Sequence, residues 1–178
     1  MIIPSSRSRG FTLIELLVVI AIIGILSAVV LVALNSARTK GTNSSANQEI
    51  TQYINAINLY FTDQGSYPYP GDTVAHCLGT YPSGQCGRTD IAPTTQSAAL
   101  DDALRPYIPG LPAGPKVTFG GSLVWLGFAY NCTQVTGSVC RAYQISWILS
   151  GASQSCARGA TASTVGGDGT ICQLAAGS

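Results

Sequence analysis

Few side chains in this chain of 178 residues are of a type and spacing that could perform catalysis or bind a metal. The single histidine, His76, precedes Cys77, and such a pair occurs in nucleophilic and metal chemistry. Either kind of site needs further ligands or a base at suitable spacing, and no such set accompanies His76. We therefore expect His76 to be a loop residue, and we expect a protein that is not an enzyme and has neither metal nor cofactor.

Three other short patterns resemble known sites. Gly166-Gly167-Asp168-Gly169 suggests calcium, but a calcium loop of the EF-hand type needs several spaced oxygen donors and this stretch has one acid. A turn is the better interpretation. Asn43-Ser44-Ser45 and Asn131-Cys132-Thr133 match the N-glycosylation pattern, which is common by chance.

The cysteines suggest disulfides in an oxidising compartment. There are six, none belongs to a Cys-x-x-Cys pair, and all lie beyond an apolar N-terminal stretch: Cys77, Cys86, Cys132, Cys140, Cys156 and Cys172. An even number at wide spacing is more typical of disulfides than of a metal site. Six cysteines allow many pairings, so the count leaves the connectivity open.

The charge content excludes an electrostatic footprint for nucleic acid. Only 10% of residues are charged, against roughly 25% in an average soluble domain. The net charge is +1 and no cluster of Lys or Arg occurs, so nucleic acid is not an expected partner.

The apolar stretch is long enough to cross a membrane. Residues 16–34 contain no charge, Pro, Asn or Gln, and a helix of that length rises by about 28 Å. Arg7 and Arg9 precede it while Arg38 and Lys40 follow, so the free N-terminal amine tips the charge balance slightly toward a cytoplasmic start. Glu15, at the beginning of this stretch, is an unusual residue for a membrane anchor.

Residues 9–15, Arg-Gly-Phe-Thr-Leu-Ile-Glu, resemble the class III signal of type IV pilins and pseudopilins. The resemblance implies that a prepilin peptidase cuts between Gly10 and Phe11 and methylates the new N-terminus at Phe11. It also implies that Glu15 acts in assembly, where it neutralises the N-terminal amine of another subunit. The alternative is an ordinary signal anchor whose Glu15 lies among the lipid headgroups, which explains the hydrophobicity but not the ordered motif.

An amphipathic helix is expected to follow over residues 36–62. Apolar side chains recur there at intervals of three and four: Ala46, Ile50, Tyr53, Ile54, Ile57 and Phe61. A helix unbroken from 11 to 62 would be about 78 Å long. Many family members have a helix-melting Pro in the membrane half; none lies between Pro4 and Pro68, so Gly24 and Gly41 are the weak points.

The second half of the chain adds to the resemblance. Residues 59–68 are similar to the helix exit of pilins and major pseudopilins, and residues 104–112 to a segment before their sheet. We expect a long loop over 63–115 with one short helix at 97–104. Two strands, 122–130 and 141–149, are expected to follow, joined by a turn at Gly137.

Pairing of sequence neighbours is our working hypothesis for the disulfides. Cys132 and Cys140 flank the expected turn, and Cys77 with Cys86 could close a small loop. Cys156 with Cys172 would bound a C-terminal loop, as in the variable loop of many pilins. In major pseudopilins of type II secretion a C-terminal loop holds calcium, and Asp168 lies in the C-terminal part of this chain.

Together these features predict an α+β protein of the ladle-shaped pilin fold, in which a long N-terminal helix, hydrophobic and then amphipathic, packs on a small antiparallel sheet. The expected parts are a leader (1–10), a transmembrane and filament-core helix (11–35), an amphipathic helix packed on the sheet (36–62), an αβ-loop (63–115), and the sheet with its disulfide-bounded loop (116–178).

The resemblance implies a structural subunit of a type IV pilus-like filament. The alternatives are a pseudopilin of a type II secretion system and a minor DNA-uptake pilin. The implied partners are copies of the chain itself, prepilin peptidase, an inner-membrane assembly platform, and the membrane before assembly. The implied location is the cytoplasmic membrane, with the N-terminus inside, and then a filament at the cell surface that serves adhesion, motility or contact.

Overall fold

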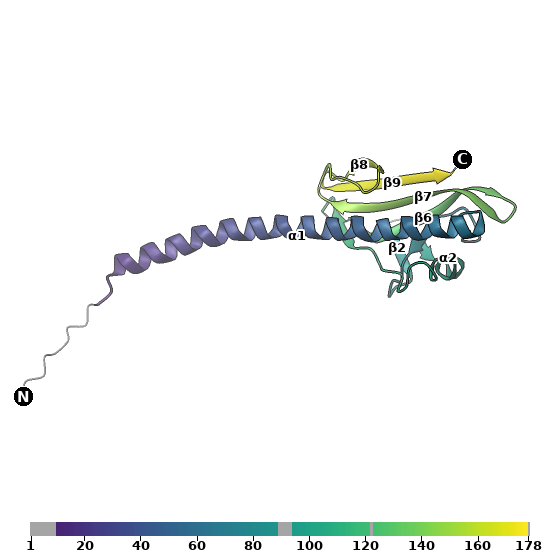
Figure 1. Ribbon diagram of the computed structural model, residues 1–178. Coiled ribbons are helices and arrows are strands. Elements are labelled where there is room, and N and C mark those ends of the chain that lie inside the picture. Colours follow the sequence, from purple (N-terminus) through teal and green to yellow (C-terminus); the bar gives the residue numbers. More distant parts are fainter. Residues whose placement is uncertain (1–9, 89–93, 122, 178) are drawn as a thin grey trace, which may run out of the picture. The chain divides into compact units, whose positions relative to one another are not determined.

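The computed structural model describes residues 10–88, 94–121 and 123–177 (Figure 1). Of the expected leader, only Gly10 lies within these residues. The chain divides into two compact units, the first ending at Arg38 and the second beginning at Thr39, and each is described by itself.

The first unit consists of the N-terminal part of helix α1 (Leu13–Gln64). Its large apolar side chains are exposed, and the helix is long and apolar enough, by length and composition, to cross a membrane. α1 has 52 residues and continues through Gly24 and Gly41. The two glycines, expected to be the weak points of the helix, therefore do not interrupt it.

In the second unit, α1 packs its apolar stripe against the sheet. The buried residues are Asn43, Ala46, Ile50, Tyr53, Ile54, Ala56 and Ile57. This confirms the predicted stripe except at Phe61, which is 42% exposed and stacks on Tyr67 with ring centroids 4.6 Å apart. The helix ends at Gln64, where Gly65 adopts a left-handed φ of 69° and its N–H bonds Phe61 O at 2.8 Å.

The sheet is larger than predicted. Within the described residues it has nine strands, in the order β4-β5-β2-β3-β1-β6-β7-β9-β8. The strands are β1 (His76–Leu78), β2 (Gln85–Arg88), β3 (Thr94–Gln96), β4 (Lys116–Phe119), β5 (Leu123–Leu126), β6 (Phe128–Thr136), β7 (Val139–Ser150), β8 (Thr161–Val165) and β9 (Gly169–Gly177). The prediction of a small sheet is therefore wrong. All strand pairs of the described residues are antiparallel, as predicted, except β1 with β3, which run parallel.

Part of the difference lies in residues 63–115, which are not only loop. They contribute β1, β2 and β3, each of three or four residues, together with helix α2 (Ala98–Leu104). α2 begins where the sequence predicted, because Ser97 is its N-cap and accepts a hydrogen bond from Leu100 N. These three strands are rich in Cys, Gln, Gly and Thr and show no long alternation of apolar residues. No local sequence pattern therefore predicts them.

Two further differences come from glycine-containing turns. The expected strand 122–130 is two strands, because Gly127 adopts a left-handed φ of 60° between β5 and β6. The C-terminal stretch expected as a loop is the hairpin β8–β9, turned at 166–168. β9 pairs with β7 along its whole length, from Gly169 opposite Ser150 to Gly177 opposite Ala142.

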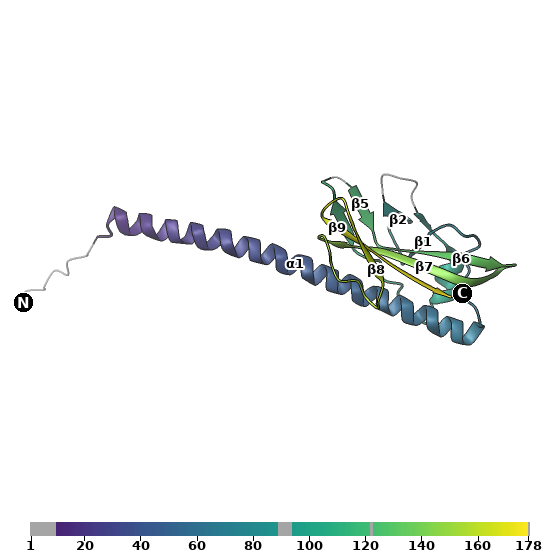
Figure 2. The same cartoon turned by 90° about the horizontal axis from the view of Figure 1, so that it is seen from above.

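The core of the second unit lies between α1 and the sheet. Its largest fully buried side chains include Trp147, Tyr53, Tyr130, Tyr143 and Phe128. A separate buried cluster joins Val117 and Phe119 of β4 to Ile148 of β7, so the sheet folds back toward itself (Figure 2). The two edges of the strand order are thereby brought near each other, which explains why the sheet is nearly barrel-like.

Buried tyrosines, among them Tyr53, Tyr130 and Tyr143, predict alkaline unfolding. Burial raises the pKa of Tyr143 to about 12 and also raises the pKa of Tyr53 and Tyr130. The fold prefers the neutral phenol, so this contribution to stability is complete below the unfolded pKa of about 10 and is lost as the pH rises from there through the folded pKa. We expect phenolate absorbance from these residues to appear only together with loss of near-UV circular dichroism above pH 10. Complete phenolate absorbance with that signal intact would contradict this prediction.

Candidate functional site

The N-terminus of α1 positions Glu15 through a capping box. Glu15 Oε2 accepts hydrogen bonds from Thr12 N at 2.8 Å and Thr12 Oγ1 at 2.9 Å, and Glu15 N donates to Thr12 Oγ1 at 3.2 Å. Reciprocal bonds between an N-cap Thr and a Glu three residues later satisfy backbone donors that the helix itself leaves free. The signal Thr-x-x-Glu stands in the sequence, and our sequence reasoning overlooked Thr12.

The peptide bond expected to be cut is accessible. Phe11 is 82% exposed, and no described atom lies within 4 Å of the position that a Cβ would take at Gly10. α1 begins at Leu13, so the bond precedes the helix. Gly10, Phe11 and Glu15 thus lie within one short segment, in which the exposed Gly10–Phe11 peptide bond is followed by a capped helix.

All six cysteines form disulfides between sequence neighbours. The pairs are Cys77–Cys86, Cys132–Cys140 and Cys156–Cys172, with Cα atoms 5.6, 5.8 and 5.7 Å apart. These separations are ordinary for disulfides. The described chain has no free cysteine, so the sulfur beside His76 is not a thiol that could act as a nucleophile.

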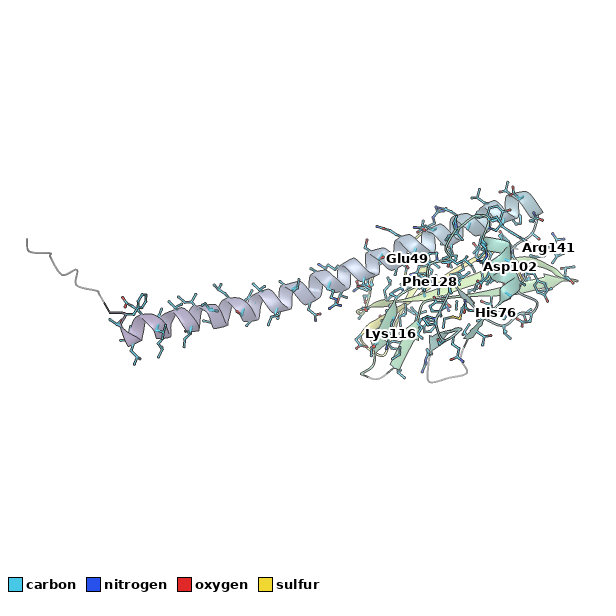
Figure 3. The ribbon with its side chains drawn as sticks, turned by 90° about the horizontal axis from the view of Figure 1, so that it is seen from below. Glu49, His76, Asp102, Lys116, Phe128 and Arg141 are labelled. Carbon is cyan, nitrogen blue, oxygen red and sulfur yellow. A yellow bond between two sulfur atoms is a disulfide. The ribbon has the colours of Figure 1, made fainter. Side chains whose placement is uncertain are left out.

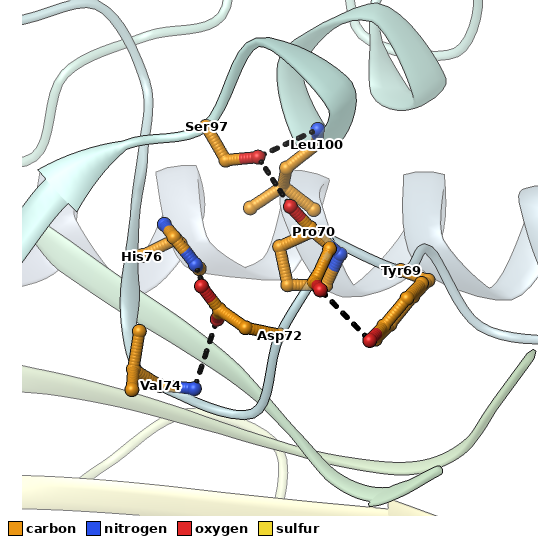
Figure 4. Close-up of polar contacts among 8 residues, drawn as sticks. Tyr69, Pro70, Asp72, Val74, His76, Ser97 and Leu100 are labelled. Carbon is orange, nitrogen blue, oxygen red and sulfur yellow. Dashed lines mark hydrogen bonds and ion pairs between the residues drawn. The ribbon is translucent and has the colours of Figure 1, made fainter. Parts of the chain in front are cut away.

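His76 is a buried structural residue at the start of β1. Its Nε2 lies 2.8 Å from Asp72 Oδ1, and the Asp72 carboxylate also accepts Val74 N at 3.0 Å (Figure 4). The segment that precedes β1 is tied to the start of α2, because Ser97 Oγ donates to Pro70 O at 3.0 Å (Figure 4). The prediction that His76 lies in a loop is wrong, since it pairs with Tyr130 of β6.

The oxygens of Asp168 accept hydrogen bonds from backbone N–H groups of the fold. Its carboxylate accepts Gly120 N at 2.6 Å, and its carbonyl accepts Gly151 N at 2.7 Å. The bond to Gly120 joins the β8–β9 turn to the β4–β5 turn. No group of three or more His, Cys, Asp or Glu side chains suited to a metal is found in the part of the chain that the structure describes.

Asn43 of the first glycosylation pattern is buried and fully engaged. Its Nδ2 donates to Ser150 O at 2.8 Å and Gln154 Oε1 at 3.2 Å, while its Oδ1 accepts Ser150 N at 2.9 Å. The amide that a glycan would modify therefore holds α1 to the chain after β7. Asn131 of the second pattern is half-buried on β6, opposite Gln144.

Removal of the Asn43 side chain tests whether its hydrogen bonds to Ser150 and Gln154 stabilise the fold. We expect Asn43→Ala to lower the free energy of unfolding by about 2 kcal/mol, because two partly buried backbone groups of Ser150 lose their partners. Thermal unfolding of the full chain in detergent measures the change. Asn58→Ala, at an exposed polar position of the same helix, serves as the control and should stay within about 0.5 kcal/mol of the parent. Equal melting temperatures of the two variants would contradict a stabilising role of the Asn43 hydrogen bonds.

The basic residues of the second unit do not form one surface. Arg105 pairs with Asp102 at 3.8 Å, and Arg158 donates to Asn55 at 2.6 Å. Lys116 and Arg141 lie toward opposite ends of the sheet in Figure 3. This dispersion gives no support to a nucleic-acid interface.

Comparison with known proteins relates this chain to proteins with an N-terminal methylation motif. Residues 5–31 match the family described as "Prokaryotic N-terminal methylation motif". Type II secretion system core protein G of Escherichia coli is 31% identical over 111 residues, which are 62% of this chain and 68% of the relative.

Shorter matches involve pilus proteins. The type IV wide pilus major component PilA4 of Thermus thermophilus is 40% identical over 61 residues, 34% of this chain and 47% of the relative. Fimbrial protein EcpC of Eikenella corrodens is 42% identical over 60 residues, 34% of this chain and 39% of the relative. The chain thus spans less than half of each of these two pilus relatives. No solved structure gives a significant match.

The match to core protein G covers 111 residues, about twice the 52 residues of α1, and the segment 9–15 lies within the residues that match the methylation motif. These similarities connect the chain to structural subunits and not to enzymes. The chain belongs to the family of type IV pilins and type II secretion pseudopilins.

Proposed function

We propose that this chain is the structural subunit of a type IV pilus-like filament, assembled through the first part of α1 after cleavage between Gly10 and Phe11. The observation that carries the proposal is the Gly10-Phe11 bond, exposed immediately before a capped helix that bears Glu15 and is apolar enough to span a membrane. The family gives these features a common purpose, because its members are filament subunits with this signal.

Cleavage changes the partner available to Glu15. In the uncut chain the carboxylate is held by Thr12. Removal of residues 1–10 creates an amine at Phe11, and in a filament that amine on one subunit can pair with Glu15 of another. A charge pair that leaves water together sets the axial register of packed helices, because a shifted register would leave both charges unpaired.

The parts of the chain follow from this role. We assign 1–10 to the leader, 11–35 to the membrane anchor and later filament core, and 36–62 to the helix that carries the sheet. The partners are further copies of the chain, prepilin peptidase and an inner-membrane assembly platform. The N-terminus lies in the cytoplasm before assembly, and the filament lies outside the cell, where an uncharged surface with three disulfides suits exposure.

A pseudopilin of a type II secretion system is the second candidate. It is favoured by the match to core protein G, which covers the larger share of the chain. The third candidate from the sequence, a DNA-uptake pilin, has no comparable support because the basic residues of the second unit are dispersed.

Mass spectrometry and electron microscopy of sheared surface material separate these candidates. The pilus proposal requires abundant filaments whose main chain begins at N-methyl-Phe11. A processed chain that is absent from surface filaments but needed for protein secretion would replace it with the pseudopilin function. A chain retained with residues 1–10 attached would contradict both.

A further inference from the structure

The face of α1 beneath the segment after β7 carries two rows of mainly uncharged polar side chains, each with one residue per turn. The first row is Asn43, Asn47, Thr51 and Asn55, and the second is Lys40, Ser44, Gln48 and Gln52. Residues four apart share a helix face, so the rows run side by side along the helix. Three asparagines of the first row hold the loop 151–160 and its flank, through Ser150, Gln154, Ser155 and Arg158.

The second row lines a groove that the fold does not fill. The groove has a volume of about 690 Å³ and is walled by α1 and by the loop: Lys40, Asn43, Ser44, Asn47, Gln48, Thr51, Gln52, Gln154, Ser155 and Ala157. The side chains of Ser44, Gln48 and Gln52 have no hydrogen-bond partner within residues 10–88, 94–121 and 123–177. Unlike the first row, these groups are free to bind something else.

The lining has a definite chemistry. Among the described residues that line the groove there is no carboxylate, and Lys40, at the first position of its row, is the one charged side chain. Amide and hydroxyl groups both donate and accept hydrogen bonds. The groove therefore matches a ligand whose own groups do both, with a single anionic group at the Lys40 end.

Other ligand classes fit less well. A nucleic-acid backbone needs several cations, and an acyl chain needs a predominantly apolar lining. An extended peptide is usually recognised by the free edge of a strand, whereas this groove presents side chains from a helix and a loop. Sugar hydroxyls, which donate and accept at successive positions, are the groups that the lining matches.

We propose that this groove binds a short oligosaccharide that bears one carboxylate, with the carboxylate on Lys40 and the hydroxyls on Ser44, Gln48 and Gln52. The site lies wholly within the second unit. Binding does not depend on filament formation, so the proposal stands or falls separately from the proposed function.

The test uses the unassembled full chain in a polyoxyethylene detergent, which carries neither sugar nor charge. Sialyllactose, a trisaccharide with one carboxylate, is titrated against lactose, and binding is followed by saturation-transfer NMR. We expect sialyllactose to bind more tightly than lactose. Lys40→Gln should raise the Kd for sialyllactose about tenfold and leave that for lactose unchanged, because only the acidic sugar loses a charge-assisted bond.

Matched variants locate the site. Lys116→Gln removes an equally exposed ammonium on β4 and should change neither Kd. Gln52→Ala should weaken both sugars, while Asn58→Ala, outside the lining, should weaken neither. Thermal unfolding shows that each variant is folded. Absence of saturation transfer from sialyllactose, or an equal effect of Lys40→Gln and Lys116→Gln, would overturn the proposal.

Discussion

Glu15→Gln is expected to leave cleavage after Gly10 intact and to reduce filament yield by at least about tenfold, because an amine buried in the filament loses its countercharge. Gln is the informative replacement. Its side-chain oxygen can still accept Thr12 N and Thr12 Oγ1, so the start of the helix is retained while the charge is removed. Mass spectrometry of membranes measures processing, and quantitative immunoblotting of sheared material measures filaments.

Thr12→Ser is the matched control. It keeps the hydroxyl that caps the helix and does not alter the charge of Glu15, so normal processing and near-normal filament yield are expected. If Glu15→Gln also assembled normally, the carboxylate would be only a helix cap, and its proposed role in assembly would be wrong. If Thr12→Ser alone abolished filaments, the methyl group of Thr12, and not the charge of Glu15, would control assembly.

The helical part of the molecule could be predicted because its signals are local. The stripe from Ala46 to Ile57 has helical periodicity, and the turn residues after Gln64 mark its end, so burial and boundary both followed from nearby residues. Phe61 was the exception. It follows the same period, but it lies in the last turn of α1, where it packs on Tyr67 and stays partly exposed.

The sheet was underestimated because several strands depend on distant partners. β1 is three residues long and exists by pairing with β6 and β3, fixed by the Cys77–Cys86 disulfide. β8 is Thr161–Val165, a polar and exposed segment, and it becomes a strand by pairing with β9. Neither pattern of side chains specifies a strand by itself, since strand propensity depends mainly on the neighbours that a residue packs against.

The same limit applies to the candidate site. Gly10, Phe11 and Glu15 could be proposed from the sequence because the motif is contiguous. The polar groove could not be predicted, because Lys40 and Gln52 line a common groove only when the loop at Gln154 lies beside α1. Contacts between residues more than a hundred positions apart leave no local trace.

Tyr81 is a buried hub that no sequence pattern reveals. Its hydroxyl donates to Leu78 O at 3.0 Å and accepts Gly114 N at 3.1 Å and Phe128 N at 3.2 Å. One side chain thus joins β1, the segment before β4, and β6. The hydroxyl fits because residue 127 has no side chain: a Cβ at Gly127 would collide with it.

Tyr81→Phe is therefore expected to lower the free energy of unfolding by about 2–4 kcal/mol, since two buried backbone groups and a partly buried one lose a hydrogen bond at once. The aromatic ring is retained, so the loss reports the hydroxyl and not a cavity. Tyr69→Phe is the control: its hydroxyl makes one exposed bond, to Gly71 O at 2.8 Å, and its removal should cost less than about 1 kcal/mol. Thermal unfolding of the full chain in detergent compares the two. Equal melting temperatures would show that Leu78, Gly114 and Phe128 are satisfied without Tyr81, and that the hub does not hold these segments together.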